Sequence, residues 1–145
     1  MNENIKKFIK DQTCATICCV DELGGAYCFS CFYAFDPDEG LLYFKSSGNS
    51  HHSALIKKNP FIAGTILPDK LKRFVIKGIQ FSGIVLDGRE EFLTQAAVKY
   101  NKKYRIACAV PGDMWIIQIY HIKMTDAAIG LGKKILWDRN SDVLQ

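Results

Sequence analysis

The chain has 145 residues, of which 48% are hydrophobic and 23% charged; this balance favours a single folded domain over residues 1–145 and excludes extended disorder. Its 19 Lys and Arg against 15 Asp and Glu give a net charge of +4, but the basic residues occur as short scattered pairs. A nucleic-acid-binding arm usually carries a long basic block, so we expect no nucleic-acid partner, and a small anionic ligand explains the excess equally well.

Three segments carry helix signals: the first and third place apolar residues three and four positions apart, which is the spacing of one face of a helix, and the second begins with a good N-cap residue. The first opens the chain, the second follows a Ser/Gly/Asn loop and stops at an Asn-Pro pair, and the third carries lysines near its end. The predicted helices are 4–11, 50–58 and 90–104.

Short runs rich in β-branched, aromatic and Cys residues alternate with turns that contain Gly, Pro or Asp, which is the pattern of strands. The predicted strands are 13–20, 26–35, 41–45, 61–67, 74–86, 115–122 and a short last one at 133–137, in a tail that is otherwise irregular from residue 123. Gly78 and Gly83 are expected to bend or bulge the long strand. Tight turns between consecutive strands favour an antiparallel sheet, and so many strands in a short chain favour a small, mainly β barrel.

The chain contains no apolar run long enough for a signal peptide or a membrane span, so we expect a cytoplasmic protein with no membrane partner. Its six Cys residues are then expected to be reduced thiols that behave as small buried hydrophobes. Cys28 and Cys31 form a C-x-x-C motif, but positions three apart on a strand face opposite sides, and no second Cys or His pair completes a zinc site. We therefore favour ordinary thiols over a metal or redox site at this motif.

The polar stretch before the second predicted helix is the strongest candidate site. The hydroxyls of Ser46, Ser47 and Ser50 come before His51 and His52, which occupy the first turn of that helix. Neighbouring residues on a helix point about 100° apart, so the two His cannot chelate one ion. Two interpretations remain: a pair of surface His, or an anion site in which backbone N–H groups, hydroxyls and an imidazole converge at the helix N-terminus.

Other motifs point to no catalyst. The segment 130–134 is glycine-rich and basic, but it lacks the spacing and the following Ser or Thr of a Walker motif, so a turn with basic flanks is favoured. Cys108 and His121 are better explained as core residues than as partners. No Ser/His/Asp order or carboxylate pair indicates a nucleophile or an acid–base catalyst, so the sequence assigns no catalytic residue.

The segment 42–60, with its aromatic strand end, Ser/Gly/Asn loop, short helix and Asn-Pro stop, resembles the phosphate-binding stretch of the flavin-binding split barrels, the pyridoxamine 5'-phosphate oxidase-like superfamily. The order of the other predicted elements agrees with that superfamily over nearly the whole chain, and the ending 123–137 is similar to its YhbP-like branch. The resemblance implies a six- to seven-stranded antiparallel split β-barrel with Greek-key topology, which binds FMN at the interface of a homodimer.

The resemblance also implies which residues hold the FMN phosphate. Ser46 and Ser47 fall where the superfamily has its phosphate-binding Thr or Asn, and His51 and His52 stand where an Arg-Lys pair usually clamps the phosphate. The two His are the main departure, because a neutral imidazole donates one hydrogen bond and carries no charge at pH 7. Lys45 is a further candidate for the missing charge.

A second group of residues is implied for the flavin ring. Gln80 matches a position that often hydrogen-bonds the isoalloxazine ring, and a loose match places part of the strand 26–35 along that ring. The residues of this strand that fall beside the ring are Tyr27, Cys28 and Phe29.

Pyridoxamine 5'-phosphate oxidation itself is not transferred to this chain. Those oxidases carry additional Arg, His and Tyr substrate residues, largely in an extension that ends in Arg-Leu-x-Pro, whereas this sequence ends in 141–145 without that pattern. The resemblance implies a small FMN-dependent oxidoreductase with an unidentified small-molecule substrate, in which the flavin supplies the redox chemistry. The alternative is a flavin- or haem-binding module that stores or senses its ligand without turnover, and the sequence does not distinguish FMN from FAD or haem.

Overall fold

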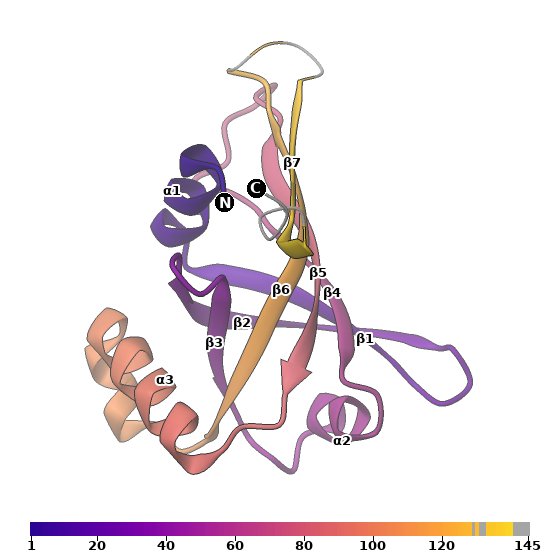
Figure 1. Ribbon diagram of the computed structural model, residues 1–145, viewed down its shortest axis with the longest axis vertical. Helices are drawn as coiled ribbons and strands as arrows, with labels where there is room; N and C mark the ends of the chain where they lie inside the picture. Colours follow the sequence, from indigo (N-terminus) through magenta and orange to yellow (C-terminus); the bar gives the residue numbers. More distant parts are fainter. Residues whose placement is uncertain (129, 131–132, 141–145) are drawn as a thin grey trace.

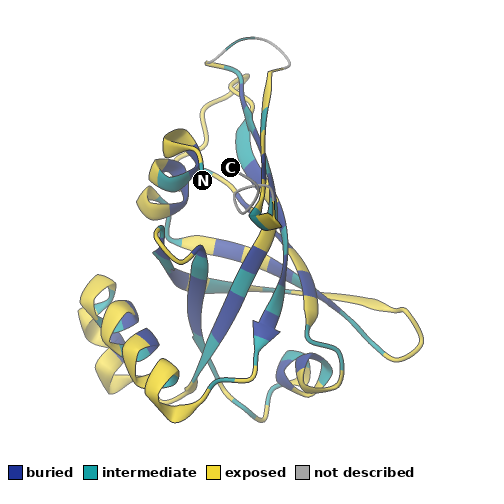
Figure 2. Cartoon of the chain, in the orientation of Figure 1, coloured by how far each residue is buried: buried dark blue, intermediate teal, exposed yellow. Residues whose placement is uncertain are grey.

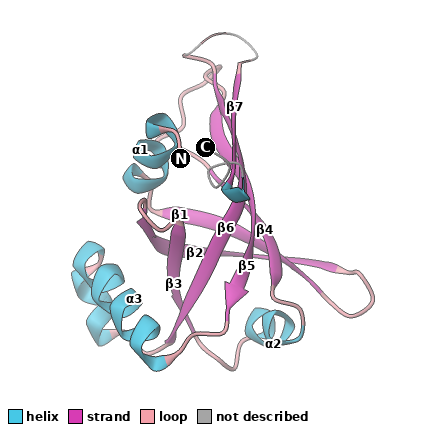
Figure 3. Ribbon diagram, in the orientation of Figure 1, coloured by secondary structure: helices cyan, strands magenta, loops and turns pink. Residues whose placement is uncertain are grey.

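The structure is a computed structural model that describes residues 1–128, 130 and 133–140. These residues form seven strands, three α-helices and one short 3-10 helix (Figure 1, Figure 3). The strands are β1 (Cys14–Val20), β2 (Ala26–Asp36), β3 (Leu41–Ser46), β4 (Phe61–Ile66), β5 (Lys77–Leu86), β6 (Asp113–Asp126) and β7 (Lys134–Asp138). The helices are α1 (Glu3–Asp11), α2 (His51–Lys58), α3 (Glu90–Lys103) and η1 (Arg105–Ala109). All the predicted strands and helices are therefore present, and η1 is the element that the sequence did not indicate.

The sheet closes on itself to form a barrel. Neighbouring strands pair in the order β3-β2-β1-β4-β5-β6-β7, and β3 also pairs with β6, so that β1 to β6 make a closed ring. Every pairing is antiparallel. β7 pairs with β6 and extends the sheet beyond the ring. The prediction of a mainly β, six- to seven-stranded antiparallel barrel is confirmed.

Buried and more exposed residues alternate along much of the strands, as the period of two in a strand requires (Figure 2). The buried residues fill the barrel. The short helix α1 adds three apolar side chains at helical spacing to the same core. Fully buried side chains of this core include Ile5, Ile9, Ile17, Tyr33, Leu42, Phe44, Ile66, Ile79, Ile117, Ile119, Ile122 and Met124.

The helix α3 covers part of the outer surface of the barrel. Its buried residues, Ala96 and Tyr100, pack with Tyr43 of β3 and Ile116 of β6, and most other residues of α3 are exposed (Figure 2). Alternate residues on β1, β2 and β4 are exposed on the outer side of the barrel. In the ranges that the structure describes, no helix is long and apolar enough to cross a membrane.

The structure corrects the predicted limits of two strands. β6 runs over Asp113–Asp126, including residues 123–126 that were predicted to be irregular, because it pairs with β3, β5 and β7 along its length. β5 begins at Lys77 and not at residue 74, and Phe74 has a φ of 65°, a left-handed conformation that a strand does not contain.

The predicted bulge is confirmed at one of the two glycines. The register of β5 and β6 shifts between Ser82 and Gly83, where β6 contains one extra residue, Tyr120. No register shift occurs at Gly78, so the expected irregularity is confirmed for Gly83 alone.

Candidate functional site

Serine hydroxyls hold the loop between β3 and α2. Ser50 is the N-cap of α2, and its hydroxyl accepts a hydrogen bond from the Ser53 N–H at 3.3 Å. The buried Ser53 hydroxyl donates to the Ser47 carbonyl at 2.7 Å and lies 2.7 Å from Ser50 Oγ. The loop is thus anchored to the helix at both Ser47 and Ser50. Ser53 was not among the predicted site residues, although the Ser-x-x-Ser spacing could have identified it.

His52 is held between a serine and an aromatic ring. Its Nε2 lies 2.7 Å from Ser46 Oγ, and its ring stacks on Phe29 with 3.8 Å between centroids and 11° between planes. Burial is the main cause that lowers the pKa of His52 below its ordinary value, and the charge of His51 adds to it. The neutral imidazole is therefore favoured, and it positions the Ser46 hydroxyl without adding a positive charge.

His51 makes a similar contact one position earlier. The edge of its ring meets the Tyr27 ring with 4.8 Å between centroids and 83° between planes, and His51 itself is exposed. Tyr27 and Phe29 are alternate residues of β2 and therefore share a face of that strand. Of the two interpretations left open by the sequence, a plain surface pair does not describe His52, whose ring is packed and hydrogen-bonded.

A row of aromatic rings continues from Phe29 to the backbone of the loop. The Phe29 and Phe44 centroids are 5.7 Å apart, and Phe44 stacks with Trp115 at 6.1 Å and 15°. The Trp115 Nε1–H donates to the Ser46 carbonyl at 3.2 Å. Ser46 is therefore held at its carbonyl by Trp115 and at its hydroxyl by His52. Sequence reasoning missed Phe44 and Trp115 as parts of the site, because only strand pairing brings them there.

Three predicted site residues lie away from this loop. Lys45 points to the opposite face of β3 from Ser46, and its amine donates to the Ala107 carbonyl at 2.8 Å. Cys28 is exposed on the outer side of β2, and Gln80 is exposed on β5. The structure brings together the other seven, which are Tyr27, Phe29, Ser46, Ser47, Ser50, His51 and His52.

The charges beside the loop come from residues that the sequence did not single out. Lys57, in the last turn of α2, donates to the Gly48 carbonyl at 3.2 Å. On the other side, Asp113 lines a shallow hollow of about 290 Å³ together with Ser47 and Gly48. An anion is therefore attracted from the α2 side of the loop and repelled from the Asp113 side.

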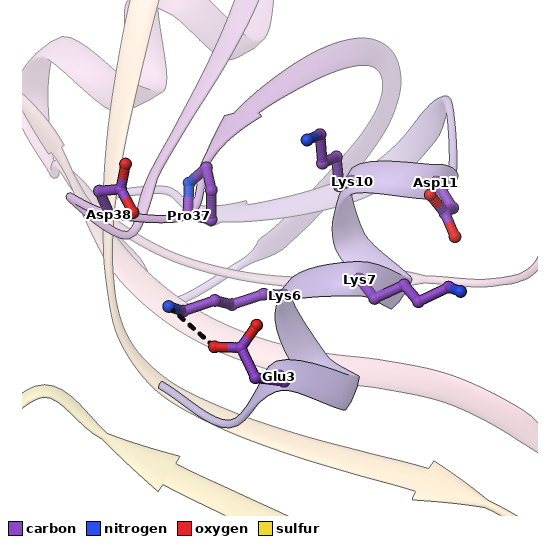
Figure 4. Close-up of a pocket in the computed structure, with 7 residues that line it drawn as sticks. All are labelled: Glu3, Lys6, Lys7, Lys10, Asp11, Pro37 and Asp38. Atoms are coloured by element: carbon purple, nitrogen blue, oxygen red, sulfur yellow. Dashed lines mark ion pairs between the residues drawn. The ribbon is translucent and has the colours of Figure 1, made fainter.

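A separate hollow lies between α1 and the turn that joins β2 to β3 (Figure 4). It measures about 410 Å³, and an ion pair of 3.1 Å joins Lys6 to Glu3 at its rim. Three lysines and three carboxylates line it, so their charges balance and favour neither an anion nor a cation. In the described ranges, no group of three or more His, Cys, Asp or Glu side chains is placed to hold a metal ion.

The position of His52 predicts a pH dependence of stability. The folded chain lowers the pKa of His52, so the unfolded chain binds more protons once the pH falls below the ordinary value of 6.5. This contribution to stability is complete above pH 6.5 and is lost as the pH falls through the lowered pKa of the folded state. Urea unfolding between pH about 7.5 and about 5.5 should show a smaller loss of stability for His52→Gln than for wild type. Parallel curves for the two proteins would contradict the prediction.

Comparison with known proteins places the chain in a family. No family model matches the chain. The chain is 34% identical to the UPF0306 protein of Photorhabdus laumondii over 137 residues. The aligned stretch covers 93% of this chain and 94% of the relative. The chain belongs to the UPF0306 family. A UPF0306 protein of Yersinia pseudotuberculosis is 33% identical over 137 residues.

Solved structures share the fold of this UPF0306 chain at low sequence identity. A haem-binding protein from Mycobacterium smegmatis superposes with a TM-score of 0.80 at 11% identity, over 94% of this chain and 57% of that chain. A FAD-binding protein from Mesorhizobium loti gives a TM-score of 0.67 at 14% identity, over 84% of this chain and 92% of that chain. These neighbours share the split-barrel fold that the resemblance implied.

Proposed function

We propose that this UPF0306 chain binds FMN and acts as a small flavin oxidoreductase on an unidentified small molecule. The observation that carries the proposal is Ser46 at the end of β3, whose hydroxyl lies 2.7 Å from His52 Nε2 and whose carbonyl accepts from Trp115 Nε1–H. The FAD-binding neighbour from Mesorhizobium loti supports a flavin as the ligand. The placement in the YhbP-like branch and in the cytoplasm is part of the same proposal.

The donors at the start of α2 fit a phosphate. The first N–H groups of a helix have no acceptor within the helix, so those of His51 and His52 suit an anion, and the helix dipole adds to the attraction. With its proton on Nε2, His52 donates to Ser46 Oγ and leaves the Ser46 hydroxyl hydrogen for a phosphate oxygen. Ser47 and Ser50 add hydroxyls to the same loop. Lys57 supplies a nearby positive charge in place of the usual basic clamp.

The rest of the chain would hold and shield the ring. When bound, the flavin accepts and returns the electrons, so the protein needs to supply only orientation, hydrogen bonds and a pocket. Tyr27 and Phe29 present aromatic surface next to the phosphate loop. Gln80 lies away from that loop, which fits a ring that reaches from one protomer to a second copy of the chain.

A homodimer is therefore part of the proposal, with the flavin at its interface. The segment between β4 and β5 exposes 75% of Leu71, all of Phe74 and 70% of Ile76. Exposed apolar side chains on one short segment are typical of an interface. The left-handed φ of 65° at Phe74 costs energy that a contact with a second copy would offset.

We expect light scattering to give the mass of a dimer for the wild-type chain and a shift towards monomer for Leu71→Ser/Phe74→Ser. The reason is the loss of two apolar anchors from the interface. Phe92→Ser on α3, which is also exposed, is the matched control and should leave the dimer intact. A wild-type monomer at micromolar concentration would contradict the homodimer without testing flavin binding.

The visible spectrum of the purified chain tests the proposed ligand. We expect flavin absorption bands, or bands that appear after incubation with FMN and desalting. Anaerobic addition of NADH or NADPH then tests turnover, since a nicotinamide that reduces the bound flavin bleaches these bands. A colourless chain that FMN does not reconstitute would overturn the proposal.

The second candidate function is a module that binds flavin or haem without turnover. The fold similarity to the Mycobacterium smegmatis haem-binding protein favours it, as does the presence of two adjacent His residues at the site. Haem carries carboxylates and no phosphate, and it needs an axial ligand, for which exposed His51 is suited. Incubation with haem in parallel with FMN separates the candidates: a Soret band that His51→Ala abolishes favours haem. Stable FMN bands that neither nicotinamide bleaches favour a flavin module.

A further inference from the structure

Two cysteines face each other on the outer side of the β1–β2 hairpin. The Cα register pairs Cys18 of β1 directly with Cys28 of β2, and these two residues are called the thiol pair below. Cys28 is exposed and Cys18 is half-buried, so both sulfurs lie on the outer surface and not in the core. As the sequence predicted for positions three apart on a strand, Cys31 lies on the opposite face from Cys28, where burial raises its pKa to about 12.

The hydrogen-bond pattern of the hairpin decides how close the thiol pair lies. Bonded and non-bonded pairs alternate along antiparallel strands. The Asp21 N–H donates to the Gly25 carbonyl at 2.9 Å, and at the far end the Tyr33 N–H donates to the Thr13 carbonyl at 3.1 Å. The thiol pair is an odd number of steps from both of these bonded pairs, so it occupies a non-bonded position.

A non-bonded position suits a disulfide. The Cα atoms of such pairs are about 4.5 Å apart, with their side chains closer than in bonded pairs. Disulfides span Cα separations of about 4.4 to 6.8 Å, so only a small backbone movement is needed. A hydrogen bond with Cys28 and partial burial raise the pKa of Cys18, which agrees with neighbouring sulfurs.

The other cysteines in the described ranges lack this arrangement. Cys14 faces Phe32 across the ladder, and Cys19 is buried opposite Tyr27. Cys108 is exposed on η1 and is not part of the β1–β2 ladder. Among the described cysteines, Cys18 and Cys28 are therefore the two that face each other across the strands and also lie on the accessible outer surface.

We propose that Cys18 and Cys28 form a reversible disulfide by exchange with a small-molecule disulfide such as oxidised glutathione. The Cys28 thiolate attacks one glutathione sulfur, forming a mixed disulfide and releasing one glutathione thiolate. The Cys18 thiolate then attacks the Cys28 sulfur, forming the intramolecular bond and releasing the second glutathione thiolate. The two cysteines lose two electrons in all, which reduce the glutathione disulfide, and their two protons pass to the released thiolates.

This site does not depend on the proposed flavin function. Cys28 lies between Tyr27 and Phe29, whose rings contact His51 and His52, so the disulfide would link β1 to the strand that carries these rings. The exposed sulfur of Cys28 makes the first attack, and the partly buried sulfur of Cys18 makes the second.

The test equilibrates the wild-type chain in glutathione buffers of stepped oxidised-to-reduced ratio, then quenches it with acid and alkylates the free thiols. Trypsin alone leaves both cysteines in one peptide, 11–45, because no Lys or Arg lies between Asp11 and Lys45, so a glutamyl protease is added to cut at Glu22. Mass spectrometry without reduction should show the fragments 11–22 and 23–39 joined, and tandem fragmentation of the joined species should place the bond at the thiol pair and not at Cys14, Cys19 or Cys31. The joined fraction should rise with the oxidised share and fall to zero with dithiothreitol.

Two variants complete the test. In Cys18→Ser the reaction should stop at a glutathione adduct on Cys28, whereas Cys14→Ser, on the same face of the same strand, should give the wild-type yield of disulfide. Three wild-type outcomes would overturn the proposal: free thiols at every ratio, a lasting glutathione adduct on Cys28, or a bond between other cysteines. The wild-type measurement stands even where a variant fails to fold.

Discussion

The double replacement His51→Ala/His52→Ala is expected to lower the affinity for FMN by about ten- to a hundredfold, or about 1.4 to 2.7 kcal/mol. Without the imidazole 2.7 Å from its Oγ, the Ser46 hydroxyl is free to rotate away from the phosphate. Loss of the ring that stacks on Phe29 also loosens the start of α2. Titration by quenching of flavin fluorescence measures the change, and single variants should show the larger part at His52.

The same titration carries two controls. Lys58→Ala changes the same helix at a site whose amine pairs with Glu22 on the surface, and it should leave FMN affinity near wild type. Riboflavin lacks the phosphate, so its affinity should change little in the double variant. An equal loss of affinity for FMN and riboflavin would indicate that the two His contact the flavin ring and not the phosphate. Unchanged FMN affinity would remove them from the site.

The elements of this fold are readable from the sequence because its signals are local. Turn residues separate β-rich runs, and the apolar spacing of α1 and α3 is that of a helix. The length of β6 is not local, since pairing with three other strands sets it. The start of β5 likewise depends on the left-handed residue Phe74, which no composition rule marks.

The residues of the site likewise fall into those that a local motif reveals and those that only the fold brings together. Ser46, Ser47 and His52 are near neighbours in the chain, so a motif could find them. Trp115 reaches the Ser46 carbonyl only because β6 pairs with β3. Lys57 reaches the Gly48 carbonyl only because the last turn of α2 lies beside the loop that precedes the helix.

The face of the strand on which a residue lies, and the register between strands, account for the remaining differences between the predicted and the observed site. Lys45 is adjacent to Ser46 in sequence but lies on the other face of β3, where its amine meets Ala107. The partner of Cys28 is set by the hairpin register and not by sequence distance: Cys31 faces the opposite side, as its spacing predicts, and the register places Cys18 opposite Cys28. A C-x-x-C spacing in a strand is therefore a poor guide to thiol pairing.

The substitution Gly83→Ala is expected to cost about 2 to 4 kcal/mol of unfolding free energy, which is large for the addition of one methyl group. The extra residue of β6, Tyr120, leaves the Gln118 carbonyl so close to Gly83 that a Cβ would lie 2.6 Å from its oxygen and 3.0 Å from Ile117 Cγ2. The Gln118 carbonyl belongs to β6, which pairs with β3 on one side and β5 on the other, so its backbone cannot move without breaking hydrogen bonds. The bulge itself would therefore have to rearrange. Urea unfolding followed by circular dichroism measures the loss.

Gly78→Ala on the same strand is the matched comparison. There a Cβ would lie 3.1 Å from Leu67 Cδ2 and 3.2 Å from the Ile66 carbonyl, and the exposed Leu67 side chain can move aside. We expect a loss of under about 1 kcal/mol at this position, where the register is regular. A loss at Gly83 of under about 1 kcal/mol, as small as that expected at Gly78, would mean that the close approach at Gly83 relaxes freely. The bulge would then follow from the extra residue in β6 alone and would not require a glycine opposite it.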